Sequence, residues 1–449
     1  MAYDEELIKR REQREKLRQQ RLAEHKKLMT KLIIAAVALV MCAVVIFMVM
    51  DRSAAPQPTE PVPTDPIATG PVSTEPQPTG EVPTEDPTES TGAAEPSEST
   101  APPETQMEDT TVIHFTAAGD INVTDKTAHL NFEEALQDVL PALCGSDLTT
   151  VNFEGNLVGA PYGAEYASAP QSLMESLYNA GVDLVQMANS RSIYNGLSGL
   201  NTTLHNIRAA GLEPVGAWST NQEAKESGGY TIREIDGVRI AIVAFTKGMD
   251  SMALPVGSEN CVNVLYEDYA TVWQEVDTSG ITKILKAVEK EKPDITIALV
   301  HWGSEYRDQI SSTQKIIKDL MLNNGVDAII GTHPHYVQAM EFDAEKGTFV
   351  AYSLGDLLGD GDTAGTEYGV IVHLEITKDN LEGETKITGY SYTSTFNSRM
   401  EGQDIKILRL DEAVRAYENG YMYRVSQELY EDMVYAQTRI VERVTPEEE

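Results

Sequence analysis

Five apolar, strand-like runs each lead directly into a cluster of polar side chains, and this alternation limits the possible folds more than any other feature. The runs are residues 113–120, 147–156, 181–190, 294–305 and 325–335. Amphipathic helical segments separate most of the runs, and several of those segments end in glycine, as helices often do. Strands that alternate with helices in this way predict an α/β domain with a largely parallel sheet.

The polar clusters that follow these runs are expected to converge. Ligands of open α/β sheets bind beyond the carboxyl ends of the strands, so the clusters should meet at one edge. Residues 230–245 carry Asp236-Gly237 between two alternating runs, which predicts a hairpin. Further strand patterns after residue 348 require a second sheet or a mixed one, and residues 406–443 are expected to form one or two terminal helices.

An uninterrupted apolar run precedes the domain. Residues 32–50 contain no charged residue, proline or glycine, and at about 1.5 Å per residue they span a hydrocarbon core of roughly 30 Å. A secretory signal peptide is the alternative, but its apolar region is shorter, about 7 to 15 residues. The charged segment 1–31 has a net charge of +4. We therefore expect a single-pass protein of the cell membrane, with its N-terminus in the cytoplasm and its main domain outside the cell.

Residues 51–110 have the composition of a disordered linker. They consist mainly of Pro, Thr, Glu, Ser and Ala, so they cannot bury enough apolar surface to offset the entropy cost of ordering. After the linker we expect the α/β domain at 111–400 and a C-terminal helical extension at 401–449. From residue 111 onward the net charge is −27. This charge argues against a nucleic-acid partner, which would need a basic surface.

Carboxylates follow the first two runs. Asp120 ends the first run, where a carboxylate can bind a cation, although Gly-Asp pairs also make ordinary turns. Asn152 and Glu154 end the second run, and strand alternation places both on the same side. Both offer oxygen ligands, although capping of the following loop is the simpler alternative.

Three histidines follow the last two runs. His301 comes directly after an apolar run, while His333 and His335 flank Pro334. A single histidine beside a tryptophan is more often a packed, hydrogen-bonded side chain, but two imidazoles at this spacing can approach one metal ion or two adjacent ones. Mixed nitrogen and oxygen ligands suit Zn²⁺, Fe or Mn²⁺ better than Ca²⁺. The sequence therefore favours a divalent metal site.

The order of these motifs resembles that of the CapA family of poly-γ-glutamate capsule synthesis, whose fold is similar to that of calcineurin-like metallophosphatases. The resemblance covers roughly residues 112–375. It implies an αββα sandwich that holds one metal ion or two, of Mn, Fe or Zn. The matching stretches are 119–120, 152–154, 188–189, 211–216, 301–306, 331–335 and 352–356. The implied metal ligands are Asp120, Glu154, Asn189, His301, His333 and His335.

The loop after the third run departs from the family pattern. Where the family usually reads Ala-Asn-Asn-His, this chain reads Ala188-Asn189-Ser190-Arg191. The histidine would protonate the leaving group, which an arginine with a pKa above about 12 cannot do near neutral pH. Either the hydrolytic activity is changed or absent, or Arg191 binds an anionic substrate directly. Arg191 and Glu305 are the predicted catalytic residues.

The resemblance implies a role in the synthesis, attachment or remodelling of an extracellular anionic polymer of the poly-γ-glutamate type. The protein would be a metal-dependent hydrolase or transferase. Its expected partners are the membrane, through residues 32–50, the polymer or its precursor, and other capsule-assembly proteins. The alternative is a catalytically inactive assembly or polymer-binding protein that keeps the cleft.

Overall fold

The computed structural model describes residues 109–400, 402–421 and 425–445. The expected cytoplasmic segment 1–31, the apolar run 32–50 and nearly all of the linker 51–110 lie outside these ranges. Within them, no helix is both long enough and apolar enough to cross a membrane.

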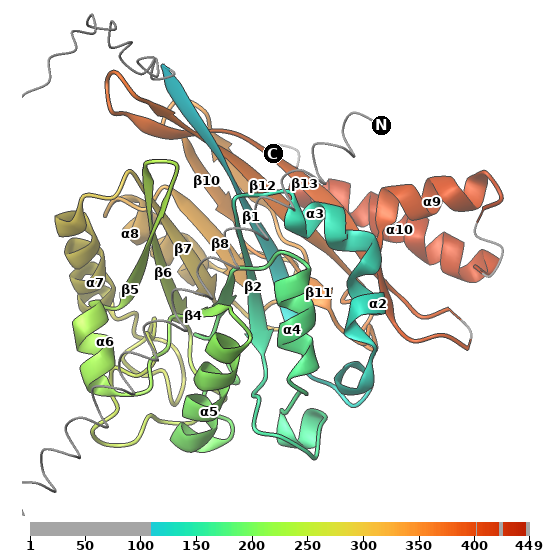
Figure 1. The fold of residues 1–449 in the computed structure, drawn as a ribbon, viewed down its shortest axis with the longest axis horizontal. Helices are drawn as coiled ribbons and strands as arrows, with labels where there is room; N and C mark the ends of the chain where they lie inside the picture. The colour runs from blue at the N-terminus through green and yellow to red at the C-terminus, as the bar shows by residue number, and fades with distance from the viewer. Residues whose placement is uncertain (1–108, 401, 422–424, 446–449) are drawn as a thin grey trace, which may run out of the picture. The chain divides into compact units, whose positions relative to one another are not determined.

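Two mixed β-sheets form the centre of the domain (Figure 1). The first sheet has the strand order β14-β13-β12-β1-β2-β3-β4, with β11 paired to β1, and the second has the order β5-β6-β7-β8-β10-β9. Strands of the first sheet are β1 (Thr110–Asn122), β2 (Leu148–Glu154), β3 (Leu184–Gln186), β4 (Glu213–Val215), β11 (Asp356–Leu358), β12 (Tyr368–Asp379), β13 (Thr385–Ser398) and β14 (Lys406–Arg409). Those of the second are β5 (Tyr230–Ile235), β6 (Val238–Thr246), β7 (Ile295–His301), β8 (Ala328–Thr332), β9 (Met340–Asp343) and β10 (Thr348–Ala351).

Helices cover the outer faces of both sheets (Figure 1). Those associated with the first sheet are α2 (Phe132–Leu136), α3 (Leu140–Cys144), α4 (Ser172–Asn179), α5 (Gly196–Ala209), α9 (Leu410–Glu418) and α10 (Gln427–Val444). On the second sheet side lie α6 (Asn221–Ser227), α7 (Thr278–Glu291) and α8 (Ser312–Leu322). The layers run helix, sheet, sheet, helix, and the predicted α/β class is confirmed.

The alternation of side chains along β6 shows why the second sheet is buried on both faces. Ile240 and Ile242 point into the core between the sheets, whereas Val243 and Phe245 pack under α7 and α8. Because successive side chains of a strand point to opposite faces, the same rule applies to β7. There Ile297 and Leu299 share the inner core, so His301, two residues on, also points between the sheets.

The five predicted runs form strands, but two sheets share them. β1, β2 and β3 belong to the first sheet, and β7 and β8 belong to the second. Within each sheet these strands are parallel. The polar clusters still converge, because the carboxyl ends of both sets lie at the same end of the facing sheets.

Two local expectations have different outcomes. The hairpin at Asp236-Gly237 is confirmed: β5 and β6 pair antiparallel, and both turn residues have positive φ, as a type I′ turn requires. The expected helical stretch 406–443 begins instead with strand β14, which pairs with β13. Four residues are too few for an alternating pattern to distinguish a strand from a helix.

Candidate metal centre

The predicted site residues meet at the ends of strands from both sheets. Asp120 lies near the end of β1, and its register partners are Asn152 on β2 and Asp356 on β11. His301 ends β7 and pairs in register with Thr332, which ends β8. The convergence expected from the sequence is therefore observed.

Asp120 links strand β1 of the first sheet to the loop that follows β8 of the second sheet. Its side chain is fully buried, and Oδ1 accepts a 2.6 Å hydrogen bond from Asn152 Nδ2. Oδ2 accepts a 3.0 Å hydrogen bond from the backbone N–H of His333. One carboxylate thus fixes the loop that carries the two histidines against the end of β1.

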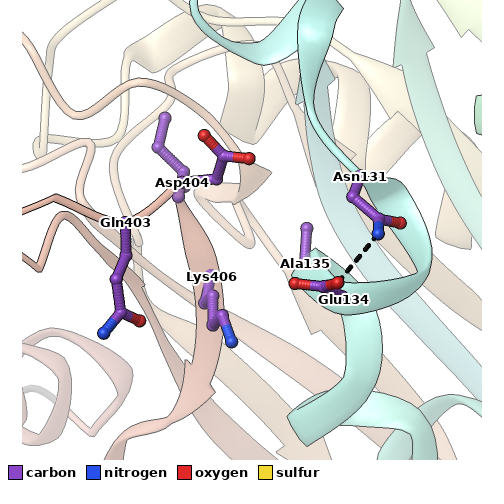
Figure 2. A pocket seen from close by; sticks show the side chains of 7 residues that line it. Asn131, Glu134, Ala135, Gln403, Asp404 and Lys406 are labelled. Carbon is purple, nitrogen blue, oxygen red and sulfur yellow. Dashed lines mark hydrogen bonds between the residues drawn. The ribbon is translucent and has the colours of Figure 1, made fainter.

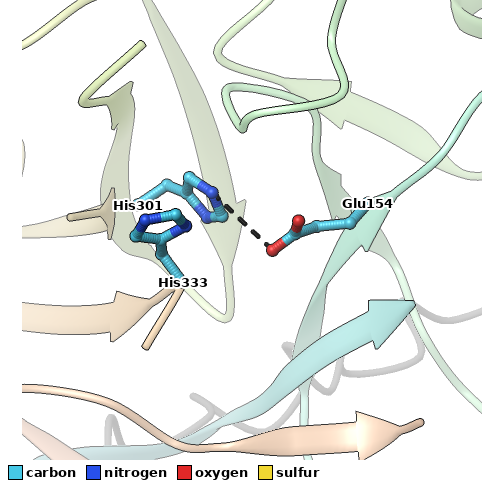
Figure 3. Close-up of side chains that lie close together, drawn as sticks. All are labelled: Glu154, His301 and His333. Carbon is cyan, nitrogen blue, oxygen red and sulfur yellow. Dashed lines mark ion pairs between the residues drawn. The ribbon is translucent and has the colours of Figure 1, made fainter. Parts of the chain in front are cut away.

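The described part of the chain contains three clusters of potential metal ligands, and Glu154, His301 and His333 form the first (Figure 3). Glu154 Oε1 lies 3.6 Å from His301 Nε2, and the rings of His301 and His333 are 4.5 Å apart. His301 Nδ1 lies 3.1 Å from Thr332 Oγ1. This contact occupies one ring nitrogen and leaves Nε2 facing the glutamate.

The other two clusters share His335. In one, His335 Nδ1 lies 2.8 Å from Asp356 Oδ1 and 3.6 Å from Asp120 Oδ2. In the other, His333 and His335 lie near Glu305, whose side chain is exposed. Because the three clusters share two histidines, they form one continuous group of donors.

Backbone strain marks the loop between the histidines. His333 and His335 have φ values of 94° and 58°. Residues other than glycine rarely adopt positive φ values. The hydrogen bond from His333 N to Asp120 and the stacking of Tyr306 on His335, with ring centres 5.5 Å apart, hold this conformation. Strained backbone of this kind is typical of functional sites.

Burial governs the charges of the first cluster. Burial raises the pKa of Glu154 well above its ordinary value, and the nearby Asp120 carboxylate adds to the shift. Burial also lowers the pKa of His301 and of His333 well below the ordinary value. Both imidazoles are therefore neutral, the form in which histidine binds metals.

In the cluster of Asp120, His335 and Asp356, the pKa of the histidine is shifted in the opposite direction. Burial alone opposes a charge on His335, yet Asp356, Glu154 and Asp120 together raise its pKa well above the ordinary value. Burial raises the pKa of Asp356 to about 6, although His335 acts against the shift. If these carboxyl groups are ionised, a nearby cation must balance their charge. That cation is either the protonated imidazole of His335 or a metal ion.

The donors present fit a divalent metal. Two of their buried polar atoms, Glu154 Oε1 and His333 Nδ1, have no hydrogen-bond partner among the residues that the structure describes. Burying a polar atom without a partner costs free energy. A carboxylate oxygen and neutral imidazole nitrogens are ligands that Mn²⁺, Fe and Zn²⁺ accept.

Asn189 and Ser190 lie beside the first cluster and are hydrogen-bonded to its strands and side chains. The Asn189 amide donates to Asn152 Oδ1 and to the Phe153 carbonyl, and its Oδ1 accepts from Arg191 N. Ser190 Oγ lies 2.9 Å from His301 Nε2 and donates to Glu154 over 3.3 Å. Asn189 thus holds the loop, while Ser190 reaches the first cluster.

Arg191 lies at the rim of the site. Its guanidinium forms a 2.7 Å ion pair with Asp250 and lies 5.2 Å from the ring centre of Tyr194. The side chain is 39% exposed, so it can contact a molecule entering from solvent. Glu305 is also exposed, although it belongs to the cluster that contains His333 and His335.

Sequence reasoning missed Asp356, which belongs to one of the clusters. It also missed two charged residues that lie beside the site, Lys247 and Asp250. Asp356 belonged to a matching motif, but its strand has only three residues. Lys247 and Asp250 follow β6, a strand without a recognised polar cluster at its end. A signal was present in the first case, because Gly355-Asp356 repeats the Gly119-Asp120 pattern.

A separate pocket of about 280 Å³ lies between the start of α2 and the residues around β14 (Figure 2). Its lining includes Glu134, Asp404 and Lys406, and Asn131 donates a 2.9 Å hydrogen bond to Glu134. No predicted site residue lines it. The pocket is therefore not part of the metal centre.

Comparison with known proteins matches residues 114–361 to the family profile described as bacterial capsule synthesis protein PGA_cap. The capsule biosynthesis protein CapA of Bacillus anthracis is 26% identical over 278 residues, covering 59% of this chain and 64% of that protein. The PGA biosynthesis protein CapA of Bacillus subtilis (strain 168) is 26% identical over 268 residues, covering 57% and 64%. The matched region thus spans less than two thirds of the length of these relatives.

Solved structures with a similar fold include the calcineurin-like phosphoesterase YfkN from Bacillus subtilis. It is 17% identical with a TM-score of 0.40, and the match covers 73% of this chain and 99% of that one. A putative 5′-nucleotidase from Staphylococcus aureus is 11% identical with a TM-score of 0.41, covering 73% and 58%.

Proposed function

Because the chain belongs to the family of bacterial capsule synthesis proteins, we propose that it is a metal-dependent hydrolase or transferase. Its substrate would be an extracellular anionic polymer of the poly-γ-glutamate type, or the precursor of that polymer. The descriptions of the two Bacillus relatives, as capsule and PGA biosynthesis proteins, support this substrate class. Other capsule-assembly proteins are its proposed partners.

One observation carries the proposal: buried carboxylates and imidazoles converge, and two of their atoms lack a partner. Glu154, His301 and His333 would hold one divalent ion, and Asp120, His335 and Asp356 would hold a second. A divalent ion supplies Lewis-acid catalysis in such a site. The sandwich of two sheets is also the fold expected for calcineurin-like phosphoesterases.

The residues of the rim would act on the substrate. Arg191 is permanently charged, so it would bind an anionic group and could not donate a proton. Glu305 is exposed within reach of the two histidines, so it would exchange a proton with a bound substrate.

Residues 32–50 would anchor the protein in the cell membrane. The apolar run and the net charge of +4 before it support an N-terminus in the cytoplasm and an extracellular domain. The acidic linker would then separate the domain from the membrane surface.

A catalytically inactive polymer-binding protein is the second candidate. The observation in its favour is the loop at Ser190 and Arg191. Ser190 Oγ makes a 2.9 Å contact with His301 Nε2, and Arg191 replaces a residue that would donate a proton. Such a protein would keep the cleft and bind the polymer without cleaving it.

Elemental analysis of the purified full-length chain tests the proposal. We expect one or two equivalents of a transition metal per chain in the wild type. In His333→Ala the metal content per chain should be at least tenfold lower. The matched control is His205→Ala, which removes an exposed histidine on α5. A wild-type protein that stays metal-free after incubation with Mn²⁺, Fe²⁺ or Zn²⁺ would contradict the proposal. Metal without turnover of the polymer would favour the binding protein.

A further inference from the structure

Lys247 has no role in the site described so far, yet it lies beside it. It follows the end of β6, and its backbone N–H donates a 2.8 Å hydrogen bond to the carbonyl of His301. Its ammonium group donates to the Gly303 carbonyl over 2.8 Å and lies 4.4 Å from the ring centre of Trp273. These contacts fix the ammonium group next to the loop that carries Glu305.

Lys247 is partly buried, and its ammonium group has no counterion among the residues that the structure describes. Among the described residues, no carboxylate lies within 4.0 Å of it. By contrast, Lys318 pairs with Glu341 at 3.1 Å and Lys378 pairs with Asp294 at 2.8 Å, and both are at most 20% exposed. Burial lowers the pKa of Lys247, although Glu305 and Asp250 oppose the shift from farther away. A cation in this setting gains most from an anion that arrives with a ligand.

Arg191 supplies a second cation on the same side of the cleft. In its ion pair with Asp250, each of the two side chains is about 40% exposed. Ion pairs that are this exposed to solvent are weak. An incoming anion can therefore exchange with the Asp250 carboxylate. Both cations lie beside His301: the Lys247 backbone N–H donates to the His301 carbonyl, and Ser190, which directly precedes Arg191, lies 2.9 Å from His301 Nε2.

We propose that Lys247 and Arg191 together form a subsite for an anionic group of the substrate, either a carboxylate or a phosphate, beside the metal cluster. This inference rests on the proposed function, because it identifies the group by which that site would hold its substrate. The subsite also answers an electrostatic problem. A domain with a net charge of −27 repels polyanions, so an anionic polymer needs a local pair of cations at the cleft.

Isothermal titration calorimetry of the full-length chain tests the subsite with two probes, γ-linked triglutamate and inorganic phosphate. We expect Lys247→Met to weaken the binding of at least one probe by about tenfold or more, as for the loss of a charge-assisted hydrogen bond. Lys247→Arg, which keeps the charge, should retain most of the affinity. The matched control is Lys286→Met, which removes an exposed lysine from α7 and should change binding less than about twofold.

The probe whose affinity falls in Lys247→Met shows whether the subsite binds a carboxylate or a phosphate. Equal affinities of wild type and Lys247→Met for both probes would overturn the inference, as would a wild type that binds neither. Metal content, measured on the same samples, separates this result from the fate of the proposed function. Anion binding that needs Lys247 in a metal-free protein would support the subsite and contradict the metal-dependent activity.

Discussion

Asp120 is the register partner of Asp356, so two buried carboxyl groups meet where β1 and β11 lie side by side. His335 Nδ1 lies 3.6 Å from the first and 2.8 Å from the second. Buried carboxyl groups that share one imidazole keep their negative charges only if a cation lies beside them. This relationship makes Asp356 a member of the candidate metal centre, although the sequence did not single it out.

Replacement of Asp356 tests that membership. Asp356→Asn keeps the shape but removes the charge, so we expect metal affinity to fall about 10- to 100-fold, whether the carboxylate binds the ion or orients His335. Titration of the metal-depleted full-length chain with Mn²⁺ or Zn²⁺ measures the change. Asp360→Asn, a partly exposed position four residues on, is the control. Equal losses in both variants would argue against a specific role.

Arg191→His tests whether only a proton donor is missing. The new imidazole would donate a proton near neutral pH, so we expect turnover of a chromogenic phosphodiester to rise at least tenfold, within the usual range of general acid catalysis. Arg191→Lys keeps a positive charge without an efficient donor and should not increase turnover. A metal-loaded Arg191→His protein with unchanged turnover would show that the defect lies elsewhere.

Gly119 is expected to tolerate no side chain. A Cβ at this position would lie 1.8 Å from the Gly355 carbonyl oxygen, directly before Asp120. We expect Gly119→Ala to lower the free energy of unfolding by about 3 kcal/mol or more, because the obstacle is backbone. Gly389→Ala in β13 is the control, since a Cβ there meets nothing within 4 Å. Chemical denaturation curves compare the two, and similar midpoints would contradict the close packing.

His373 should make stability depend on pH. Its ring contacts Thr116 and Thr393, and burial lowers its pKa from 6.5 to about 4, with a further contribution from His114. Between these values the unfolded chain binds a proton that the folded chain does not, so stability is full above about pH 6.5 and falls as the pH drops toward 4. The loss is on the order of 2–3 kcal/mol.

Thermal unfolding between pH 4 and 7 measures this dependence. We expect His373→Gln to flatten the curve over that range, whereas His205→Gln, at an exposed position, should leave it as in the wild type. Curves of equal slope for wild type and His373→Gln would assign the pH dependence to other groups.

The convergence of the site was predictable because parallel strands bring their carboxyl ends to one edge. Glu154 and His301 each end an apolar strand, and Asp120 lies two residues before the end of another. The family was recognisable from the same motifs. That His301 faces the space between the sheets also follows from the alternation of β7.

Other features depend on contacts that no local pattern encodes. Strand β11 has three residues, so Asp356 gave no periodic signal. The contacts of Asn189 with Asn152 and Phe153 come from a neighbouring strand. Lys247 reaches the site because β6 lies beside β7, a neighbour relationship that the sequence leaves open.

Anomalous X-ray scattering from crystals of this protein, soaked with Mn²⁺ or Zn²⁺, tests the central claim most directly. A metal bound by the buried clusters predicts an anomalous peak between Glu154, His301 and His333, with a second peak near Asp120, His335 and Asp356 if the centre is dinuclear. Crystals that diffract well at the metal edge but show no peak among these side chains would contradict it.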